Sequence, residues 1–188
     1  FAIDWMRLDV EGRLFVGDAA KPESYAGYGA PIHAAGAGTV VRAGDGLPDQ
    51  TPGQLPDPAT ITIANVDGNH VVIDHGGGVF TFYAHLRAGS VAVKAGDAVA
   101  AGQRIGLLGN SGNTSAPHLH FHAMVGPSPL GSDGIPFELE AFTVTRHLDG
   151  DDLDRLLAGE ALAPAAPATE TVERALPLDV SVVDFGER

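Results

Sequence analysis

The 188-residue sequence contains no cysteine, which excludes disulfides, thiolate catalysis and cysteine-ligated zinc. Any bound metal must therefore be held by histidines and carboxylates. Basic residues are also scarce, because 11 Lys and Arg stand against 24 Asp and Glu and leave a net charge of −13. Nucleic-acid binding relies on Lys and Arg at the phosphates, so this balance argues against nucleic acid as a partner. No apolar run approaches the roughly 20 residues that span a bilayer, so no transmembrane segment is expected.

Glycine and proline are plentiful, with 25 and 13 residues respectively. This composition favours short strands joined by turns over long helices. The length suits one domain with a real hydrophobic core. The sequence starts at Phe1, inside an expected strand and without an initial Met, so we expect the natural N-terminus, with any signal peptide or anchor, to lie upstream.

Short alternating apolar stretches separated by glycine turns predict an all-β fold. We expect an antiparallel two-sheet, sandwich-like architecture with an open groove floored by the histidine-containing strand described below. The segment 6–28 is expected to form a long loop or small hairpin, and the proline-rich segment 45–60 a surface loop. The expected strands lie in residues 1–4, 30–44, 60–66, 69–75, 79–86 and 118–125.

The composition changes near residue 149. Residues 149–162, "DGDDLDRLLAGEAL", suit a short helix because acidic residues at its start complement the helix dipole. An Ala/Pro linker at 163–169 and a terminal strand within 176–185 follow. We therefore predict a domain over residues 1–136, with a core at 29–125 and insertions at 6–28 and 45–60, and a C-terminal extension over residues 137–188.

One short run of the sequence contains three closely spaced histidines. Residues 110–122, "NSGNTSAPHLHFH", place His118, His120 and His122 at every second position, so an extended strand presents all three imidazoles on one face. Asp4 and His85 also lie on expected strands or at their ends. Zinc accepts N and O ligands, and a catalytic site has three protein ligands and a water. Asp4 and one histidine of "HLH" can supply two ligands, and spacing alone does not identify the third. Unligated imidazoles nearby can move protons and stabilise an oxyanion.

The blocks "NHVVIDHGGGVFTFYAHL", "VKAGDAVAAGQRIGLLGNSGNTSAPHLHFHAM" and the initial "AIDW" resemble lysostaphin/LytM-type zinc metallopeptidases in order and separation. The resemblance covers residues 29–125 and the N-terminal strand. It implies one zinc ion per chain, with Asp4 and His120 as metal ligands and His85 and His118 as unligated catalytic histidines. It also implies hydrolysis of peptide bonds in peptidoglycan, and an extracellular or cell-envelope location in a bacterium.

The sequence departs from the family's pattern at the family's first motif, H-x-G-x-D. Its histidine would fall immediately before Phe1, outside the printed sequence, and Ala2 occupies the glycine position. Two functional hypotheses follow. The chain is an active zinc endopeptidase on peptidoglycan peptides, or it is a catalytically degenerate module of the same fold that binds wall peptides or activates other cell-wall hydrolases. The residue before Phe1 and a metal assay distinguish the two.

Four further residues are candidates for the groove or for contacts behind the ligands. His122 occupies a position where the family often has an acid, and we favour a groove-lining or supporting role over that of a fourth ligand. Tyr83 alternates with His85, so we expect both on one face, where Tyr83 suits either a hydrogen bond in the groove or core packing. His75 is expected at a turn or the groove rim. Asn110 belongs to the turn before the histidine strand, where it serves either the turn itself or substrate contact.

The segment "VKAGDAVAAGQRIG" also resembles the hairpin region of biotinyl and lipoyl carrier domains. A carrier needs a modified lysine at a hairpin tip, whereas Lys94 lies on the strand that enters the turn. The histidine blocks have no role in a carrier, so the metallopeptidase interpretation is preferred.

Overall fold

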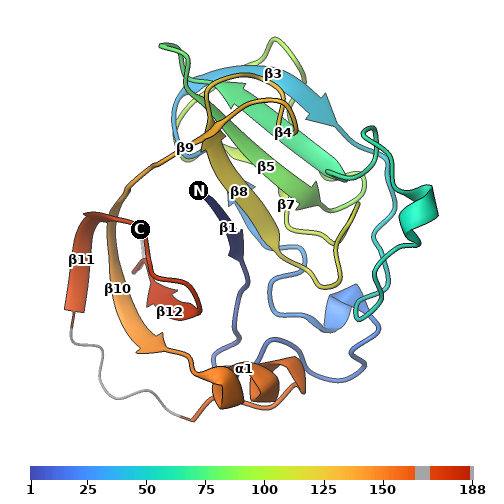
Figure 1. Cartoon of the computed structure of the whole chain (residues 1–188), viewed down its shortest axis with the longest axis vertical. Coiled ribbons are helices and arrows are strands. Elements are labelled where there is room, and N and C mark those ends of the chain that lie inside the picture. The colour runs from blue at the N-terminus through green and yellow to red at the C-terminus, as the bar shows by residue number, and fades with distance from the viewer. Residues whose placement is uncertain (164–169, 187–188) are drawn as a thin grey trace. The chain divides into compact units, whose positions relative to one another are not determined.

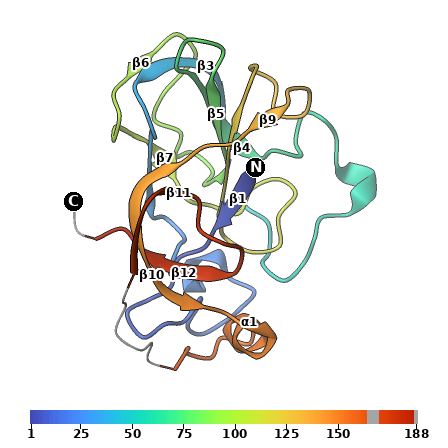
Figure 2. The same cartoon turned by 60° about the vertical axis from the view of Figure 1, so that its left-hand side comes forward.

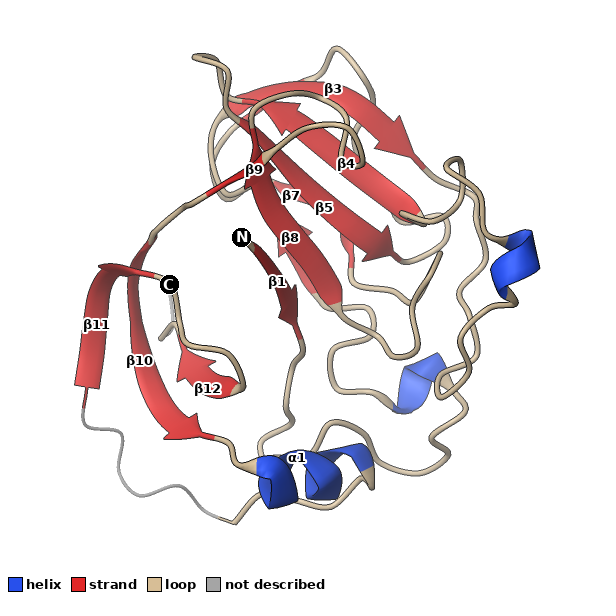
Figure 3. Cartoon of the chain, in the orientation of Figure 1, coloured by secondary structure: helices blue, strands red, loops and turns tan. Residues whose placement is uncertain are grey.

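The computed structural model describes residues 1–163 and 170–186, and most of its regular structure is β-strand (Figure 1, Figure 3). The all-β prediction is confirmed. The chain forms two compact units: unit 1 comprises Phe1–Arg7 and Phe15–Ile135, and unit 2 comprises Leu8–Leu14 and Pro136–Arg188. Part of the expected insertion 6–28 thus belongs to the same unit as the C-terminal segment, which the sequence did not indicate.

Unit 1 is built around a seven-stranded antiparallel sheet. Its N-terminal strand pairs with a strand more than a hundred residues later in the chain, which brings the first residues beside the histidine run. The strand order is β1 (Ala2–Trp5), β8 (Leu119–Met124), β5 (Phe80–Leu86), β4 (Asn69–Asp74), β3 (Gly38–Gly44) and β6 (Ala98–Val99), with β9 (Gly134–Ile135) paired to β8. A separate two-stranded sheet pairs β2 (Pro31–His33) with β7 (Arg104–Leu107).

The central strands β4 and β5 form the core of unit 1. Val71, Val72 and Ile73 are fully buried, and Phe82 and Tyr83 are almost so. Consecutive buried residues mean that both faces of these strands are covered, as is typical of strands inside a sheet. β-branched and aromatic side chains suit this environment because they pack on a pleated surface. The core therefore holds the strands that carry the candidate site.

The prediction of a strand at residues 60–66 is wrong. A short 3-10 helix, η2 (Pro58–Thr60), and turns occupy this segment. The Asn65 side chain accepts a hydrogen bond from the backbone N–H of Thr62 at 2.6 Å and donates to the carbonyl of Thr60 at 2.9 Å. Asn side chains compete in this way with ladder hydrogen bonds. The expected surface loop 45–60 thus continues to the start of β4, and a second 3-10 helix, η1 (Pro22–Ser24), lies in the segment 6–28.

Unit 2 contains a three-stranded antiparallel sheet with β10 (Leu139–His147) between β11 (Glu170–Ala175) and β12 (Ser181–Asp184), as Figure 2 shows. The helix α1 (Gly150–Leu157) was predicted, and the Asp149 side chain caps it by accepting from the N–H of Asp152 at 2.8 Å. The terminal strand was also predicted, whereas β10 and β11 were missed. The expected linker, apart from Ala163, lies outside the described residues. No helix within the described ranges is long and apolar enough to cross a membrane.

Candidate active site

The pairing of β1, β8 and β5 assembles the candidate site on one face of the sheet. Asp4 lies opposite His120 in the β1–β8 register, and Ala84 of β5 lies opposite His120 on the other side. Phe82 is likewise opposite His122. Residues at alternate positions share a face, so these side chains point the same way.

Asp4 and His120 are in direct contact. The Nδ1 atom of His120 donates to Oδ1 of Asp4 at 2.8 Å. The Nε2 atom of His118 lies 3.7 Å from the same carboxylate oxygen. The hydrogen bond from His120 is the main cause that holds the pKa of Asp4 below its ordinary value, with a smaller contribution from the charge of His118. The structure thus brings two of the predicted histidines to one carboxylate oxygen of Asp4.

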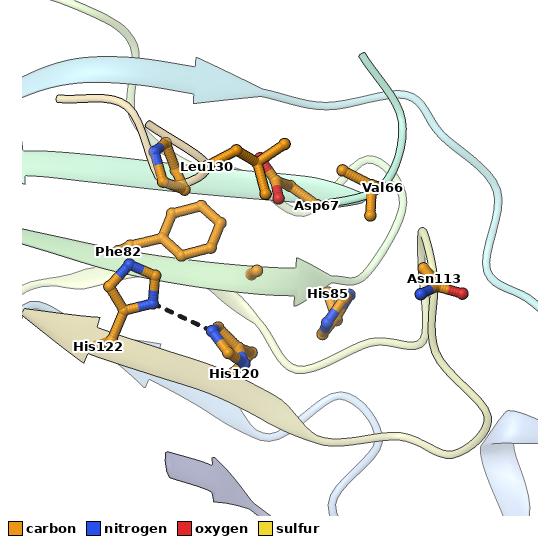
Figure 4. A pocket seen from close by; sticks show the side chains of 10 residues that line it. Val66, Asp67, Phe82, His85, Asn113, His120, His122 and Leu130 are labelled. Carbon is orange, nitrogen blue, oxygen red and sulfur yellow. Dashed lines mark hydrogen bonds between the residues drawn. The ribbon is translucent and has the colours of Figure 1, made fainter. Parts of the chain in front are cut away.

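His122 contacts the other side of the His120 ring. The Nε2 atom of His120 and the Nδ1 atom of His122 share a hydrogen bond of 3.1 Å, which Figure 4 marks. The His122 ring also packs 5.1 Å from the ring of Phe82. Burial, and then the nearby charge of His120, lowers the pKa of His122 to about 4. His122 therefore contacts the His120 ring and lines the cavity.

His85 completes the group from the end of β5. Its ring centroid lies 4.7 Å from that of His118, and the residue is only 8% exposed. Burial, and then the charge of His118, lowers the pKa of His85 to about 4. The backbone of His85 has a φ of 62°, in the left-handed region that residues other than glycine rarely adopt. This backbone conformation interrupts the strand alternation and lets His85 share the face of Ala84.

A cavity of about 250 Å³ opens beside these rings (Figure 4). His85, His120 and His122 line it, all within unit 1. Burial raises the pKa of Asp67, whose carboxyl also faces the cavity. Sequence reasoning missed most of the other lining residues. The period-two pattern of β5 could have identified Phe82 and Ala84, but the loop residues carried no such signal: Val66, Asp67, Asn113, Pro129 and Leu130.

Tyr83 lies on the other face of β5 and packs in the core. It is 2% exposed, and its ring lies 5.2 Å from that of Phe121. Its hydroxyl accepts from the N–H of Ala35 at 2.8 Å and from the hydroxyl of Thr81 at 3.1 Å. The sequence interpretation that placed Tyr83 and His85 on one face is corrected, because the left-handed conformation of His85 breaks the alternation.

His75 and Asn110 do not line the cavity either. The two ring nitrogens of His75 bond the carbonyl of Ala37 and the hydroxyl of Thr81, which ties the β4–β5 hairpin to the preceding loop. Asn110 is fully buried, and its side-chain amide donates to the carbonyl of Gln50 at 2.9 Å. Both side chains thus serve local structure, which for Asn110 is the turn alternative stated above.

Tyr83→Phe tests this placement. The change leaves the Ala35 N–H and the buried Thr81 hydroxyl without the Tyr83 oxygen as acceptor, so we expect a loss of about 1–2 kcal/mol in the free energy of unfolding. Any peptidase activity should stay within about twofold, since the hydroxyl is distant from the cavity. Denaturant unfolding followed by the fluorescence of Trp5, the single tryptophan, measures the first quantity. A drop in kcat with unchanged stability would contradict the core placement.

The donor atoms at the candidate site are of the kinds that zinc binds, but they make up only part of a zinc site. Asp4 Oδ1 and His120 Nδ1 are the O and N donors that zinc accepts, and they already point at one another across a shared proton. A cation held by both atoms would replace that proton. Within residues 1–163 and 170–186, no group of three His, Asp or Glu side chains could hold a metal ion. The described residues therefore offer two candidate donor atoms, whereas a zinc site usually has three or four protein ligands.

Residues 23–131 match Peptidase family M23, and this segment is more than half of the sequence. The chain belongs to that family. The all-β fold and the paired Asp and His donors agree with the lysostaphin/LytM-type resemblance seen in the sequence.

Among characterised relatives, "Peptidoglycan DD-endopeptidase ShyA" of Vibrio cholerae serotype O1 is 38% identical over 108 residues, covering 53% of this chain and 24% of that protein. "DD-carboxypeptidase/endopeptidase Mpg" of Neisseria meningitidis serogroup B is 43% identical over 63 residues, 34% of this chain and 14% of that protein. The chain thus matches less than a quarter of the length of these curated relatives. The catalytic domain of lysostaphin from Staphylococcus simulans aligns with a TM-score of 0.41 and 26% identity, over 65% of this chain and 83% of that one.

Proposed function

We propose that the protein is a zinc-dependent endopeptidase that hydrolyses peptide bonds in peptidoglycan. The observation that carries the proposal is the contact between Asp4 Oδ1 and His120 Nδ1, with His85 and His122 beside His120 at a cavity. Membership of Peptidase family M23 supports peptidase chemistry. The printed name of the relative ShyA supports peptidoglycan as the substrate. A protein that acts on this substrate would work at the cell envelope or outside the cell.

Asp4 and His120 would hold the metal, with a third ligand from the position immediately before Phe1. Zinc held there would supply Lewis acidity toward the scissile carbonyl and would lower the pKa of a bound water to about 7. His122 would keep the His120 ring in place through the 3.1 Å hydrogen bond to its Nε2. Partners of this kind orient ligating histidines and raise their basicity.

His85 and His118 would act on the substrate without binding metal. The Nδ1 atom of each ring contacts a backbone carbonyl, which leaves Nε2 available to the reacting groups. The Nε2 of His118 lies near the Asp4 carboxylate, so it is placed to accept a proton from the attacking water. The more buried His85 faces the cavity from the end of β5, where its Nε2 can accept a proton from the hydroxyl of the tetrahedral intermediate and pass it to the leaving amine.

The cavity beyond the histidines suits small, weakly apolar peptide side chains. Phe82 and Ala84 form its floor, and Val66, Pro129 and Leu130 add apolar walls. Its volume of about 250 Å³ leaves room for part of a peptide beside the histidines.

Incubation of isolated cell walls with the protein tests the proposal. The protein used should carry the natural residue before Phe1. We expect turbidity to fall and new free amines to form, and a chelator to remove nearly all of this activity, with recovery on adding zinc. Mass spectrometry should find about one zinc per chain. A chain that binds isolated wall without zinc and without cleavage would instead be the degenerate binding or activating module.

A further inference from the structure

One turn contacts both catalytic candidates in the same way. The Nδ1 atom of His85 lies 2.8 Å from the carbonyl oxygen of Ser111, and the Nδ1 atom of His118 lies 2.8 Å from that of Ala116. A carbonyl oxygen only accepts hydrogen bonds, so each Nδ1 must carry a hydrogen. A neutral imidazole has one N–H, and its Nε2 is then a bare acceptor. Both carbonyls belong to the single segment 110–116.

The side chain of Ser111 holds the first of these carbonyls in place. Ser111 is fully buried, and its hydroxyl donates to the carbonyl of Leu86 at 2.7 Å while accepting from the N–H of Asn69 at 2.9 Å. Leu86 follows His85 at the end of β5, and Asn69 begins β4. One hydroxyl thus bridges both central strands at the point where His85 lies.

The side chain of Thr114 occupies the corresponding place near His118. Its hydroxyl lies 2.9 Å from the carbonyl of Ala116, 3.0 Å from Oδ1 of Asn110 and 3.2 Å from the His118 ring. Thr114 is 3% exposed. These contacts close the turn on itself and keep the Ala116 carbonyl directed at His118.

The strained backbone of His85 is held by the same surroundings. Its N–H donates to the carbonyl of Asp67 at 3.3 Å, and its carbonyl accepts from the N–H of Gly109 at 3.1 Å. A left-handed conformation at a residue with a side chain costs about 1–2 kcal/mol and persists only where neighbouring contacts determine it. The ring bond to Ser111 is the third such contact, so the orientation of His85 depends on the turn.

We infer that the turn 110–116 sets the ring tautomers of His85 and His118, with Ser111 and Thr114 as positioning residues that hold the two carbonyls. Both rings then present a bare Nε2 toward the substrate. The catalytic meaning of this arrangement rests on the proposed function, whereas the tautomers do not. A ring in the other tautomer would offer an N–H where a proton acceptor is needed, and such an error costs up to about 10⁴-fold in a histidine-dependent hydrolase.

Imidazole nitrogen NMR on the metal-free protein tests the inference directly. Long-range proton–nitrogen spectra distinguish an N–H nitrogen from a bare one, and about pH 8 lies above the ordinary histidine pKa of about 6.5. We expect His85 and His118 each to give the Nδ1–H pattern. An Nε2–H pattern, or a rapid average of both tautomers, at either ring would overturn the inference. The spectra need no activity, so they remain decisive even for a chain that cleaves nothing.

Ser111→Ala tests the positioning role, with Ser90→Ala as the matched control. The Ser90 hydroxyl also bonds backbone, accepting from the N–H of Leu107 at 3.1 Å, away from the histidines. We expect Ser111→Ala to give His85 a mixture of tautomers and to lower kcat about tenfold with KM nearly unchanged. Ser90→Ala should leave both quantities as they are. Loss of kcat without any change in the His85 spectrum would contradict the role.

Thr114 offers a second, independent pair of variants. Thr114→Ser keeps the hydroxyl and should preserve the Nδ1–H pattern of His118, whereas Thr114→Val keeps the shape and removes the hydroxyl. We expect Thr114→Val to disturb His118 and to leave His85 unchanged. If the two variants give the same His118 spectrum as the unsubstituted chain, the turn does not act through Thr114. Correct tautomers in a protein that does not cleave wall would refute the proposed function alone.

Discussion

His120→Ala should remove both the metal and the activity, whereas His118→Ala should remove the activity and leave the metal bound. In the first variant Asp4 loses its 2.8 Å partner, and the site loses one of its two expected zinc donors. The remaining carboxylate should therefore bind zinc only weakly. The loss of Lewis acid stabilisation, worth several kcal/mol, corresponds to a fall of at least about 10³-fold in kcat. In the second variant both donors remain, and the loss of a proton-transfer group should cost about 10²-fold or more.

Metal content by mass spectrometry and kcat on wall peptides measure the two outcomes together. His33→Ala is the control, because His33 lies exposed on β2, outside the large sheet, and should change neither quantity. Equal metal loss in His118→Ala and His120→Ala would refute the division of roles. Full zinc occupancy in His120→Ala would show that the metal is held elsewhere, and the proposal that Asp4 and His120 are ligands would fail with it.

The sequence predicted which histidines and carboxylate lie together better than it predicted the residues that line the cavity. The alternation of His118, His120 and His122 identified one face of a strand, and the structure brings Asp4 to that face from the far end of the chain. Period-two alternation works for regular strands because it depends on backbone geometry alone. It failed at His85, where a left-handed residue ends the regular part of β5 and separates the histidine from Tyr83.

The loops and the strands of unit 2 were predicted less well than the regular strands of unit 1. Residues 60–66 resemble a strand in their Ile, Thr and Val content, yet Asn65 closes a turn there with its side chain. The nine-residue strand β10 was missed because its polar and apolar residues mix without a clear boundary before the helix. The cavity walls at Val66 and Leu130 come from such loops, whose placement depends on contacts distant in sequence.

Gly68→Ala should cause a large loss of stability in unit 1. Gly68 has a φ of 63° and lies directly on the backbone of the turn 110–116. A Cβ atom at this position would overlap the Ser111 carbonyl and lie 2.6 Å from the Ser111 hydroxyl, and both atoms are fixed by their own hydrogen bonds. Neither group can move without breaking the contact to His85 or to β4. The variant therefore suffers the conformational cost of about 1–2 kcal/mol and an overpacking cost of about 1–3 kcal/mol.

Gly77→Ala provides a matched control for the conformational part. Gly77 has the same φ of 63°, in the β4–β5 turn, and a Cβ atom added there would meet nothing within 4 Å. It should therefore lose only about 1–2 kcal/mol. Denaturant unfolding followed by Trp5 fluorescence gives both values, and the excess for Gly68→Ala measures the steric contact with Ser111. Since the Asp67 carbonyl also accepts from the His85 N–H, activity should fall in Gly68→Ala and persist in Gly77→Ala. Equal stability losses in the two variants would show that the turn yields at Ser111, and that His85 is not held by close backbone packing.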